Sequence, residues 1–415
     1  MPLFRLSNPV SPIAVDFGSA SVKLLQATAG ERPVAIAAAE IRIPDELRSQ
    51  PLEVRLEALG DAIVTAIRTR GFRGRRVVCS PVSGLMRVQH VQVPVAEEAD
   101  AAGQVTGMLE TALQRLPGSL IVRSRPVLET SRDGQARSEH LAFAMAREDA
   151  MRHVDFFRRR GLQIVAMHNE IEAMVHAFDH LHRRAGDEQL TTLYVDLGWG
   201  ATKVAIGHGT GTVFAKSIQV GGRHLDQVVA TSLRCDLATA RSRRIAESLV
   251  NVPAAVPVAL VAPVSMVAPV PAATEPVPAM LRAAMRSAGT DVATDRRVGR
   301  EPASLGAAIP HGVPAGGPDF GEVLESLSDE LSACLRYHSA LFPGRGIDRA
   351  IFLGGEARQV GLCRHLAATL HVHAKAGDPL ARMLGPERPH GLPEPEAPHP
   401  GWAVACGLLA APTDL

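Results

Sequence analysis

Two apolar runs near the start of the chain are separated by a short polar turn. Residues 13–17 are apolar except for Asp16, and a second apolar run starts close to Lys23 after a turn of glycine and serine. Runs of this length, bounded by turn residues, predict a strand, a tight loop and a second strand. Backbone N–H groups and hydroxyls in such a loop can bind a phosphate, and a carboxylate at the end of the incoming strand can hold hydrated Mg²⁺. An ordinary hairpin turn explains this one stretch equally well.

The same pattern recurs about 180 residues later in the chain. An apolar run ends at Asp196, a turn of small residues follows, and a second apolar run starts after Thr202. A third stretch, residues 350–357, joins an apolar run to Gly354 and Gly355. The backbone of two successive glycines can lie close to a base or a ribose. The three stretches together predict two similar halves that bind one nucleotide between them.

The spacing of apolar positions also divides the chain into units. Residues 35–43 alternate as in a strand, residues 53–70 carry apolar positions at helical spacing, and residues 77–80 predict a buried strand. Residues 86–167 then predict strand, helix, strand, strand, helix and strand, a block large enough for an inserted subdomain. Residues 252–318 are dominated by Pro, Ala and Val without periodicity, which predicts an extended or disordered insertion at the rim of a lobe.

Composition excludes several classes of protein. A chain of 415 residues with 46% hydrophobic residues predicts at least two domains. The net charge of +1, without a sustained basic run, argues against a nucleic-acid-binding protein. The first residues show no signal peptide and no apolar anchor, which predicts a cytoplasmic location. The five cysteines form no CxxC pair, and the 16 histidines offer no evident set of three ligands, so a zinc site is not expected.

The three glycine-containing stretches, in this order, resemble the phosphate-1, phosphate-2 and adenosine motifs of the actin-like ATPase superfamily. The position of the inserted block narrows the resemblance to the PilM and FtsA branch. Several short sequence segments are similar to those of the PilM family, the cytoplasmic actin-like proteins of type IV pilus assembly. The segments that carry this resemblance are Val93-Pro94, Leu116-Pro117, Ala144 to Glu148, Val220 to Gly222, Leu353 to Ala357 and Ala403 to Leu408. The resemblance implies an α/β, two-lobed actin-like (RNase H-like) fold with an inserted α+β subdomain in the first lobe.

This resemblance also predicts how the chain is divided. The expected parts are a first-lobe core (1–85), the inserted subdomain (86–167), an inter-lobe helix (168–190), a second-lobe core (191–251), the Pro/Ala-rich insertion (252–318), second-lobe helices with the adenosine motif (319–380) and a C-terminal segment that returns to the first lobe (381–415).

By the same resemblance, ATP and Mg²⁺ are expected between the lobes. Asp16 and Asp196 are expected to bind the metal from solvent-facing hairpin tips. Glu170 and Asp196 are the candidate catalytic residues, and Glu170 at the start of the inter-lobe helix would orient the attacking water. A helix-start glutamate favoured by the helix dipole is an equal alternative for Glu170. The candidate nucleotide-binding residues are Asp16, Gly18, Ser19, Ser21, Lys23, Asp196, Gly198, Thr202, Gly221, Gly222, Arg244, Gly354, Gly355 and Glu356.

Some positions depart from the PilM pattern. Arg241 stands where the family usually has a glutamate beside the nucleoside, whereas Arg244 keeps the charge of the usual lysine. His168 stands where the family usually has an aspartate. Weak, altered or absent nucleotide binding therefore stays open, and so does ATPase activity.

The resemblance implies a cytoplasmic scaffold of a type IV pilus or related secretion platform, peripheral to the inner membrane only through a partner. That partner would be the cytoplasmic N-terminal peptide of a PilN-like membrane protein, held in the cleft between the subdomain and the first lobe, and other platform proteins would join it. Nucleic acid is not an expected partner, and self-association is left open. The alternatives are a nucleotide-free scaffold of the same fold and a small-molecule kinase of the same superfamily.

Overall fold

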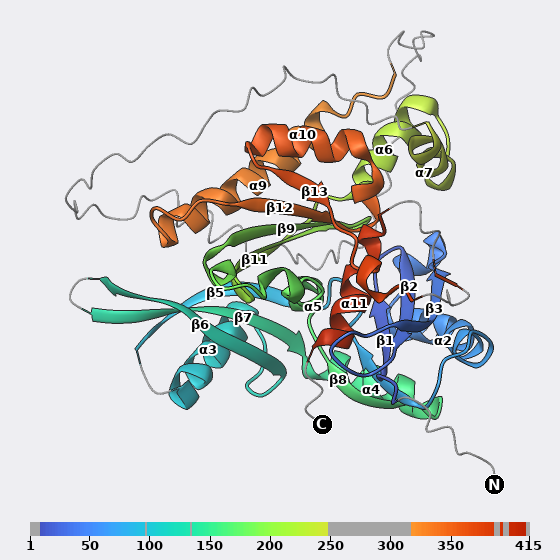
Figure 1. Cartoon of the computed structure of the whole chain (residues 1–415), viewed down its shortest axis with the longest axis horizontal. Coiled ribbons are helices and arrows are strands. Elements are labelled where there is room, and N and C mark those ends of the chain that lie inside the picture. Colours follow the sequence, from blue (N-terminus) through green and yellow to red (C-terminus); the bar gives the residue numbers. More distant parts are fainter. Residues whose placement is uncertain are drawn as a thin grey trace, which may run out of the picture.

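The structure is a computed structural model that describes residues 9–95, 98–132, 135–247, 317–385, 391–392 and 398–411. In these residues the chain forms two five-stranded sheets, each in its own lobe, and a three-stranded sheet in a subdomain beside them. Figure 1 shows the second lobe above, the first lobe below it, and the subdomain beside the first lobe. Most of the Pro/Ala-rich insertion expected at residues 252–318 lies outside the described residues, so its predicted conformation stays a prediction.

The first lobe contains the first hairpin, followed by an antiparallel third strand and two parallel strands. The strands, in order across the sheet, are β3 (Ala35–Arg42), β2 (Ser21–Ala27), β1 (Ile13–Phe17), β4 (Arg76–Cys79) and β8 (Gln163–Met167). Helices α2 (Leu52–Thr69) and α4 (Arg147–Arg159) contribute to one core with this sheet, and the short helix α1 (Asp45–Arg48) precedes α2. Apolar residues of α2, including Leu56, Leu59 and Ile63, are buried there because they recur on one helical face.

The second lobe repeats this topology. Its strands, in order across the sheet, are β11 (Gly211–Ile218), β10 (Thr202–His208), β9 (Thr191–Leu197), β12 (Arg349–Leu353) and β13 (Ala374–Ala376). Its helices are α6 (Gly222–Leu233), α7 (Leu237–Ala246), α9 (Gly321–Leu341) and α10 (Val360–Leu370). The registers correspond as well, since Asp16 lies opposite Lys23 in the first hairpin and Asp196 lies opposite Lys203 in the second. The two halves predicted from the sequence are therefore present as two similarly connected sheets.

Two helices lie between the lobes, α5 (Glu170–His176) and α11 (Ala403–Ala410), as Figure 1 shows. Residues of both sheets and of both helices share one apolar core. The two helices cross at Gly407, where a Cβ atom would lie 1.6 Å from the carbonyl oxygen of Ala173. The close crossing of α5 and α11 is therefore possible only because residue 407 has no side chain.

The inserted subdomain has its own small core. Its strands are ordered β5 (Arg87–Pro94), β7 (Gln135–Ala146) and β6 (Leu120–Arg132), all antiparallel, and helix α3 (Glu98–Ala112) packs on them. The subdomain also touches the second lobe: His90 stacks on Phe214 with ring centroids 5.1 Å apart, and the Tyr337 hydroxyl donates a 2.8 Å hydrogen bond to Glu139. The subdomain thus links the two lobes from the side.

The remaining regular elements are short 3-10 turns: η1 (Asp179–His182), η2 (Asp187–Gln189), η3 (Gly355–Arg358), η4 (Ala381–Met383) and η5 (Pro400–Trp402). Among the helices of the described segments, none is long and apolar enough to cross a lipid bilayer.

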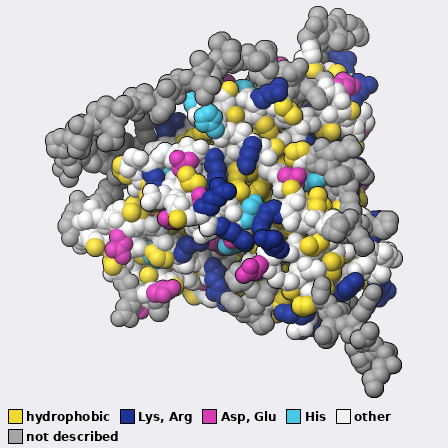
Figure 2. Space-filling view, in the orientation of Figure 1, with side chains coloured by type: hydrophobic (Ala, Val, Ile, Leu, Met, Phe, Trp, Pro, Cys, Tyr) yellow, Lys and Arg dark blue, Asp and Glu magenta, His cyan; other side chains and the backbone are white. Residues whose placement is uncertain are grey.

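Charge is not spread evenly over the surface. Figure 2 shows Lys and Arg side chains, with some His, gathered near the middle of one face. Burial lowers the pKa of Arg382, with a contribution from Arg183 and Arg32, and burial, Arg382 and Arg183 together lower the pKa of His180 to about 4. The net charge of +1 therefore hides local concentrations of positive charge.

Candidate functional site

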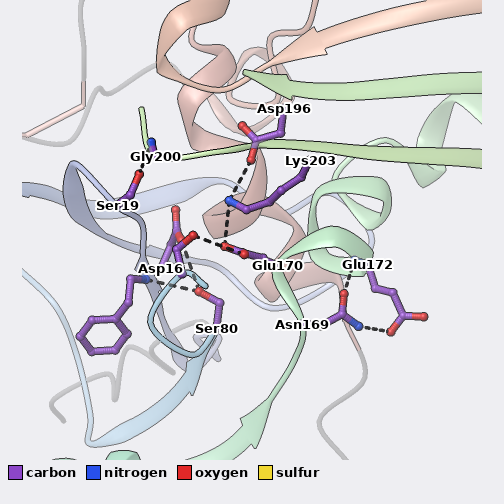
Figure 3. A network of polar contacts seen from close by, with 11 residues as sticks. Asp16, Ser19, Ser80, Asn169, Glu170, Glu172, Asp196, Gly200 and Lys203 are labelled. Carbon is purple, nitrogen blue, oxygen red and sulfur yellow. Dashed lines mark hydrogen bonds and ion pairs between the residues drawn. The ribbon is translucent and has the colours of Figure 1, made fainter. Parts of the chain in front are cut away.

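The tips of the two similar hairpins meet between the lobes. The backbone N–H of Gly200, in the β9–β10 turn, donates a hydrogen bond of 3.1 Å to the hydroxyl of Ser19, in the β1–β2 turn. A Cβ atom on Gly200 would lie 3.2 Å from the Cβ atom of Ser19, so the turns are in close contact. The sequence prediction that these turns face one another holds in this conformation (Figure 3).

The two aspartates at these hairpins are buried. Asp16 is 4% exposed and Asp196 is 8% exposed, so the expectation that both lie at solvent-facing tips is wrong. The reason is that the opposite lobe covers each hairpin tip. The order of apolar and polar residues within one β-strand does not show this contact. Asp16 accepts a hydrogen bond of 3.3 Å from the hydroxyl of Ser80, at the end of β4.

A lysine lies among the acidic groups. The ammonium of Lys203, on β10, lies 2.9 Å from Oε2 of Glu170 and 3.3 Å from Oδ2 of Asp196 (Figure 3). Burial lowers the pKa of Lys203, but Glu170, Asp196 and Asp16 outweigh that effect and raise it above its ordinary range. Lys203 is therefore a charged group that links the second hairpin to the start of α5. This role was not predicted from the sequence, although Lys203 follows Asp196 at the same spacing as Lys23 follows Asp16.

Glu170 is the first residue of α5, directly after the capping residue. The Asn169 side chain accepts a hydrogen bond of 2.7 Å from the backbone N–H of Glu172, which caps the helix. The Glu170 carboxylate is bound by Lys203 and accepts a 3.4 Å hydrogen bond from the Ser83 hydroxyl. Burial is the main cause that raises the pKa of Glu170, and Lys203 opposes it. The carboxylate is engaged in an ion pair and also lines the larger cavity described below, so its predicted role in orienting a water molecule stays a prediction.

Burial raises the pKa of Asp16 to about 6. Glu170 and Asp196 add to this increase, whereas Lys23 and Lys203 oppose it. Asp16, Glu170 and Asp196 thus share this region with the buried ammonium of Lys203.

Other predicted phosphate-binding side chains are hydrogen bonded within their own lobes. The Ser21 hydroxyl donates a 2.7 Å hydrogen bond to Glu40, and the Lys23 ammonium donates one of 3.1 Å to Ser21. The Thr202 hydroxyl donates a 2.8 Å hydrogen bond to the carbonyl oxygen of Val220. These contacts stabilise the hairpins themselves.

The predicted glycines are closely surrounded. A Cβ atom on Gly18 would lie 3.0 Å from the Ser21 carbonyl oxygen, on Gly198 2.6 Å from that of Ala201, and on Gly221 2.6 Å from that of Gly198. Gly354 has a φ of 85° and faces Asp196. The next residue, Gly355, is less crowded, because a Cβ atom there would meet no heavy atom of the described residues within 4 Å. Gly354 thus lets the third motif reach the second hairpin.

The space beside the adenosine motif is filled by side chains. Arg244 is fully buried, and it donates hydrogen bonds of 2.7 Å to Asp226 and 2.7 Å to Glu356. The Trp199 indole donates a further 2.7 Å hydrogen bond to Asp226. The Glu356 carboxylate lies against Gly222, where a Cβ atom would be 2.3 Å from Oε1. Arg244 and Glu356, both predicted to contact nucleotide, therefore pair with each other. Asp226, the second partner of Arg244, was not predicted from the sequence.

The empty space left beside the adenosine motif is correspondingly small. A cavity of about 10 Å³ remains beside Gly221, Gly222 and Glu356, which is room for no more than about one water molecule. A larger cavity of about 400 Å³ lies where the subdomain and the two lobes meet. The residues around it include Ser19, Arg48, Arg55, Met86, Trp199 and Arg223. The Arg48 guanidinium lies 4.0 Å from the centroid of the Trp199 ring.

Asp16 and Asp196, the predicted Mg²⁺ ligands, do not make a complete metal site of side chains alone. The described residues contain no group of three His, Cys, Asp or Glu side chains placed to hold a metal ion. The ammonium of Lys203 lies between Asp196 and Glu170. Because Mg²⁺ is often bound by one or two carboxylates together with phosphate oxygens and waters, the prediction that Asp16 and Asp196 hold it stays a prediction.

No protein-family profile and no curated protein sequence matches the chain. Solved structures do match it. A chain of the PilM–PilN type IV pilus biogenesis complex is 17% identical, with 97% of each chain covered and a TM-score of 0.67. The ethanolamine utilization protein EutJ from Carboxydothermus hydrogenoformans is 14% identical, with 98% of this chain and 90% of that chain covered and a TM-score of 0.45. MreB5 of Spiroplasma citri bound to ADP is 13% identical, with 89% and 93% covered and a TM-score of 0.40.

The first of these likenesses spans almost the whole of both chains. It confirms the predicted fold class, a two-lobed actin-like fold, in the form that agrees with PilM.

Proposed function

We propose that the chain is an assembly scaffold of a type IV pilus or related secretion platform, and that it holds the cytoplasmic N-terminal peptide of a PilN-like inner-membrane protein. The observation that carries this proposal is the likeness over 97% of both chains to a chain of the PilM–PilN complex. A protein recruited in this way would reach the inner membrane without an anchor of its own.

The subdomain has features that suit a peptide partner. Strand β6 is an edge of the three-stranded sheet, and an extended peptide can add to such an edge by main-chain hydrogen bonds. Arg125, in the middle of β6, forms an ion pair with Glu172 of α5, so the subdomain is in direct polar contact with the inter-lobe helix here. Met108, on α3, is 48% exposed, and Leu116, shortly after α3, is 79% exposed, so the subdomain carries apolar side chains on its surface.

Capture by peptides tests the proposal. Peptides from the cytoplasmic tails of membrane proteins encoded beside this one are immobilised, and the intact chain is compared with a chain lacking residues 86–167 that has first been checked for cooperative unfolding. Capture of the intact chain alone is expected. Equal capture of both chains, or of neither, would contradict the proposal.

A matched pair of substitutions locates the contact. Leu116→Asp introduces a charge on the subdomain, and Val360→Asp does the same at a position 58% exposed on the second lobe. Weaker capture with Leu116→Asp than with Val360→Asp is expected, because the peptide is proposed to contact the subdomain.

Nucleotide binding is a second candidate function. The contact between Ser19 and Gly200 brings the two predicted phosphate loops together, which favours it. The ion pairs of Lys203 and Arg244 oppose it, because they fill the positions of the cation and the nucleoside. Calorimetric titration with ATP, in MgCl₂ and separately in EDTA, tests this function. If neither buffer gives a heat of binding, the nucleotide-binding function is contradicted. The nucleotide-free scaffold of the same fold is then favoured.

A further inference from the structure

We propose that Lys203 is a built-in cation of the inter-lobe site, which holds Glu170 and Asp196 together in place of a divalent ion, so that the lobes close without Mg²⁺. The proposal concerns the closure of the two lobes and is independent of the proposed peptide partner.

The position of Lys203 is the first argument. Its ammonium contacts Glu170 of α5 and Asp196 of the second hairpin at 2.9 and 3.3 Å. These distances are those of hydrogen-bonded ion pairs, whereas Mg²⁺ requires oxygen ligands at about 2.0–2.1 Å in an octahedral arrangement. The two carboxylates are thus held by an ammonium at hydrogen-bonding distance.

The comparison of the two hairpins is the second argument. Lys23 and Lys203 occupy matching positions, each opposite an aspartate on the neighbouring strand. Lys23 turns to Ser21 and Glu40 within its own lobe. Lys203 instead reaches Glu170 of α5, so of these two lysines it is the one of the second hairpin that connects its lobe to an inter-lobe helix.

Charge compensation is the third argument. Glu170 and Asp196 are each 8% exposed, and buried carboxylates without a partner are costly. A cation beside these carboxylates offsets that cost, and Lys203 supplies it. A divalent ion beside the buried ammonium would be repelled by it, because two positive charges would then share the same pair of carboxylates.

The first test uses the intact chain. Thermal unfolding and small-angle X-ray scattering are measured in EDTA and in 5 mM MnCl₂, with Mn²⁺ as the probe ion. The midpoint of unfolding and the radius of gyration are expected to be the same in both buffers. A midpoint raised by Mn²⁺ in the intact chain, and not in an Asp196→Asn variant, would overturn the proposal.

The second test removes the cation. Lys203→Ala is expected to unfold at a lower temperature in EDTA, to have a larger radius of gyration, and to recover in MnCl₂ by about 5 °C or more, because Glu170 and Asp196 then have room for the ion and its waters. Lys216→Ala is the matched control, since Lys216, on the neighbouring strand β11, forms an ion pair with Glu330 of α9 and lies outside the site. It should respond equally to both buffers.

Lys203→Gln covers the case in which the alanine variant does not fold. Its amide keeps a hydrogen-bond donor to the carboxylates but carries no charge, so recovery in MnCl₂ is again expected. If neither folded variant responds to Mn²⁺ more than the intact chain does, or if neither variant folds with or without the ion, Lys203 does not stand in for a divalent cation and the proposal fails.

Discussion

The hydroxyl of Ser19 accepts a hydrogen bond of 3.1 Å from the backbone N–H of Gly200, although the two residues are 181 positions apart in the chain. This contact joins the turn of the first hairpin to the turn of the second. It lies at the wall of the larger inter-lobe cavity, which both residues line. The closed arrangement of the two lobes therefore includes a direct polar contact between the loops that the sequence predicts to bind phosphate.

Ser19→Ala should weaken this closed arrangement. Loss of one hydrogen bond is expected to lower the free energy of unfolding by about 1 kcal/mol and to increase the radius of gyration. Urea unfolding and small-angle scattering measure the two effects. Ser49→Ala, in the same cavity but outside this contact, is the control, and an equal change in both variants would show that the contact does not hold the lobes together.

Gly407→Ala should destabilise the chain strongly. The new methyl group would stand 1.6 Å from the Ala173 carbonyl oxygen, so α11 and α5 would have to move apart within the shared core. Overpacking of this kind typically costs about 1–3 kcal/mol, and urea unfolding measures it.

Gly103→Ala is the control for that substitution. Gly103 lies within α3, and a Cβ atom there would meet no heavy atom within 4 Å in the described part of the chain. Alanine is the better helix former by up to about 1 kcal/mol, so this variant should be as stable as the parent or more stable. A similar loss of stability in both variants would rule out the helix crossing as the cause.

The paired hairpins could be predicted from the sequence because each is a local pattern, apolar residues bounded by small and polar ones. Asp16 and Asp196 were placed at the strand ends by that pattern, but their burial depends on the opposite lobe. Lys203 of β10 pairs with Glu170 of α5. The spacing of apolar residues in β10 does not predict this pair, because the two residues lie on different elements. Arg244 was interpreted as a nucleotide-binding residue because a positive charge near that position is typical of the family.

Asp16 should make stability depend on pH. Its pKa rises from an ordinary 3.8 to about 6 on folding, so the folded state binds more protons between these values. The stabilising contribution is fully present below about pH 4 and is lost as the pH rises through about 6. At pH 7.5 the ionised, buried carboxylate costs up to about 3 kcal/mol relative to the protonated form.

Asp16→Asn tests this dependence, because asparagine resembles the protonated carboxyl group and can still accept the Ser80 hydrogen bond. The variant should be more stable than the parent at pH 7.5, and the difference should vanish near pH 4. Ser80→Ala retains the titrating carboxyl group, so it should keep the pH dependence of the parent. A constant difference between Asp16→Asn and the parent over this range would contradict the assignment.

Arg244→Met should show that the nucleoside side of the site is held by ion pairs. Arg244 is fully buried between Asp226 and Glu356, and its removal leaves two buried carboxylates without their cation. Breaking a buried pair in this way costs about 3–5 kcal/mol, which urea unfolding detects. Arg243→Met, at an exposed neighbouring position, should change stability by no more than about 0.5 kcal/mol. Adding Asp226→Asn and Glu356→Gln to Arg244→Met removes the unpaired charges, so the triple variant should recover part of the loss. If the triple variant were less stable than Arg244→Met alone, uncompensated charge would not be the cause.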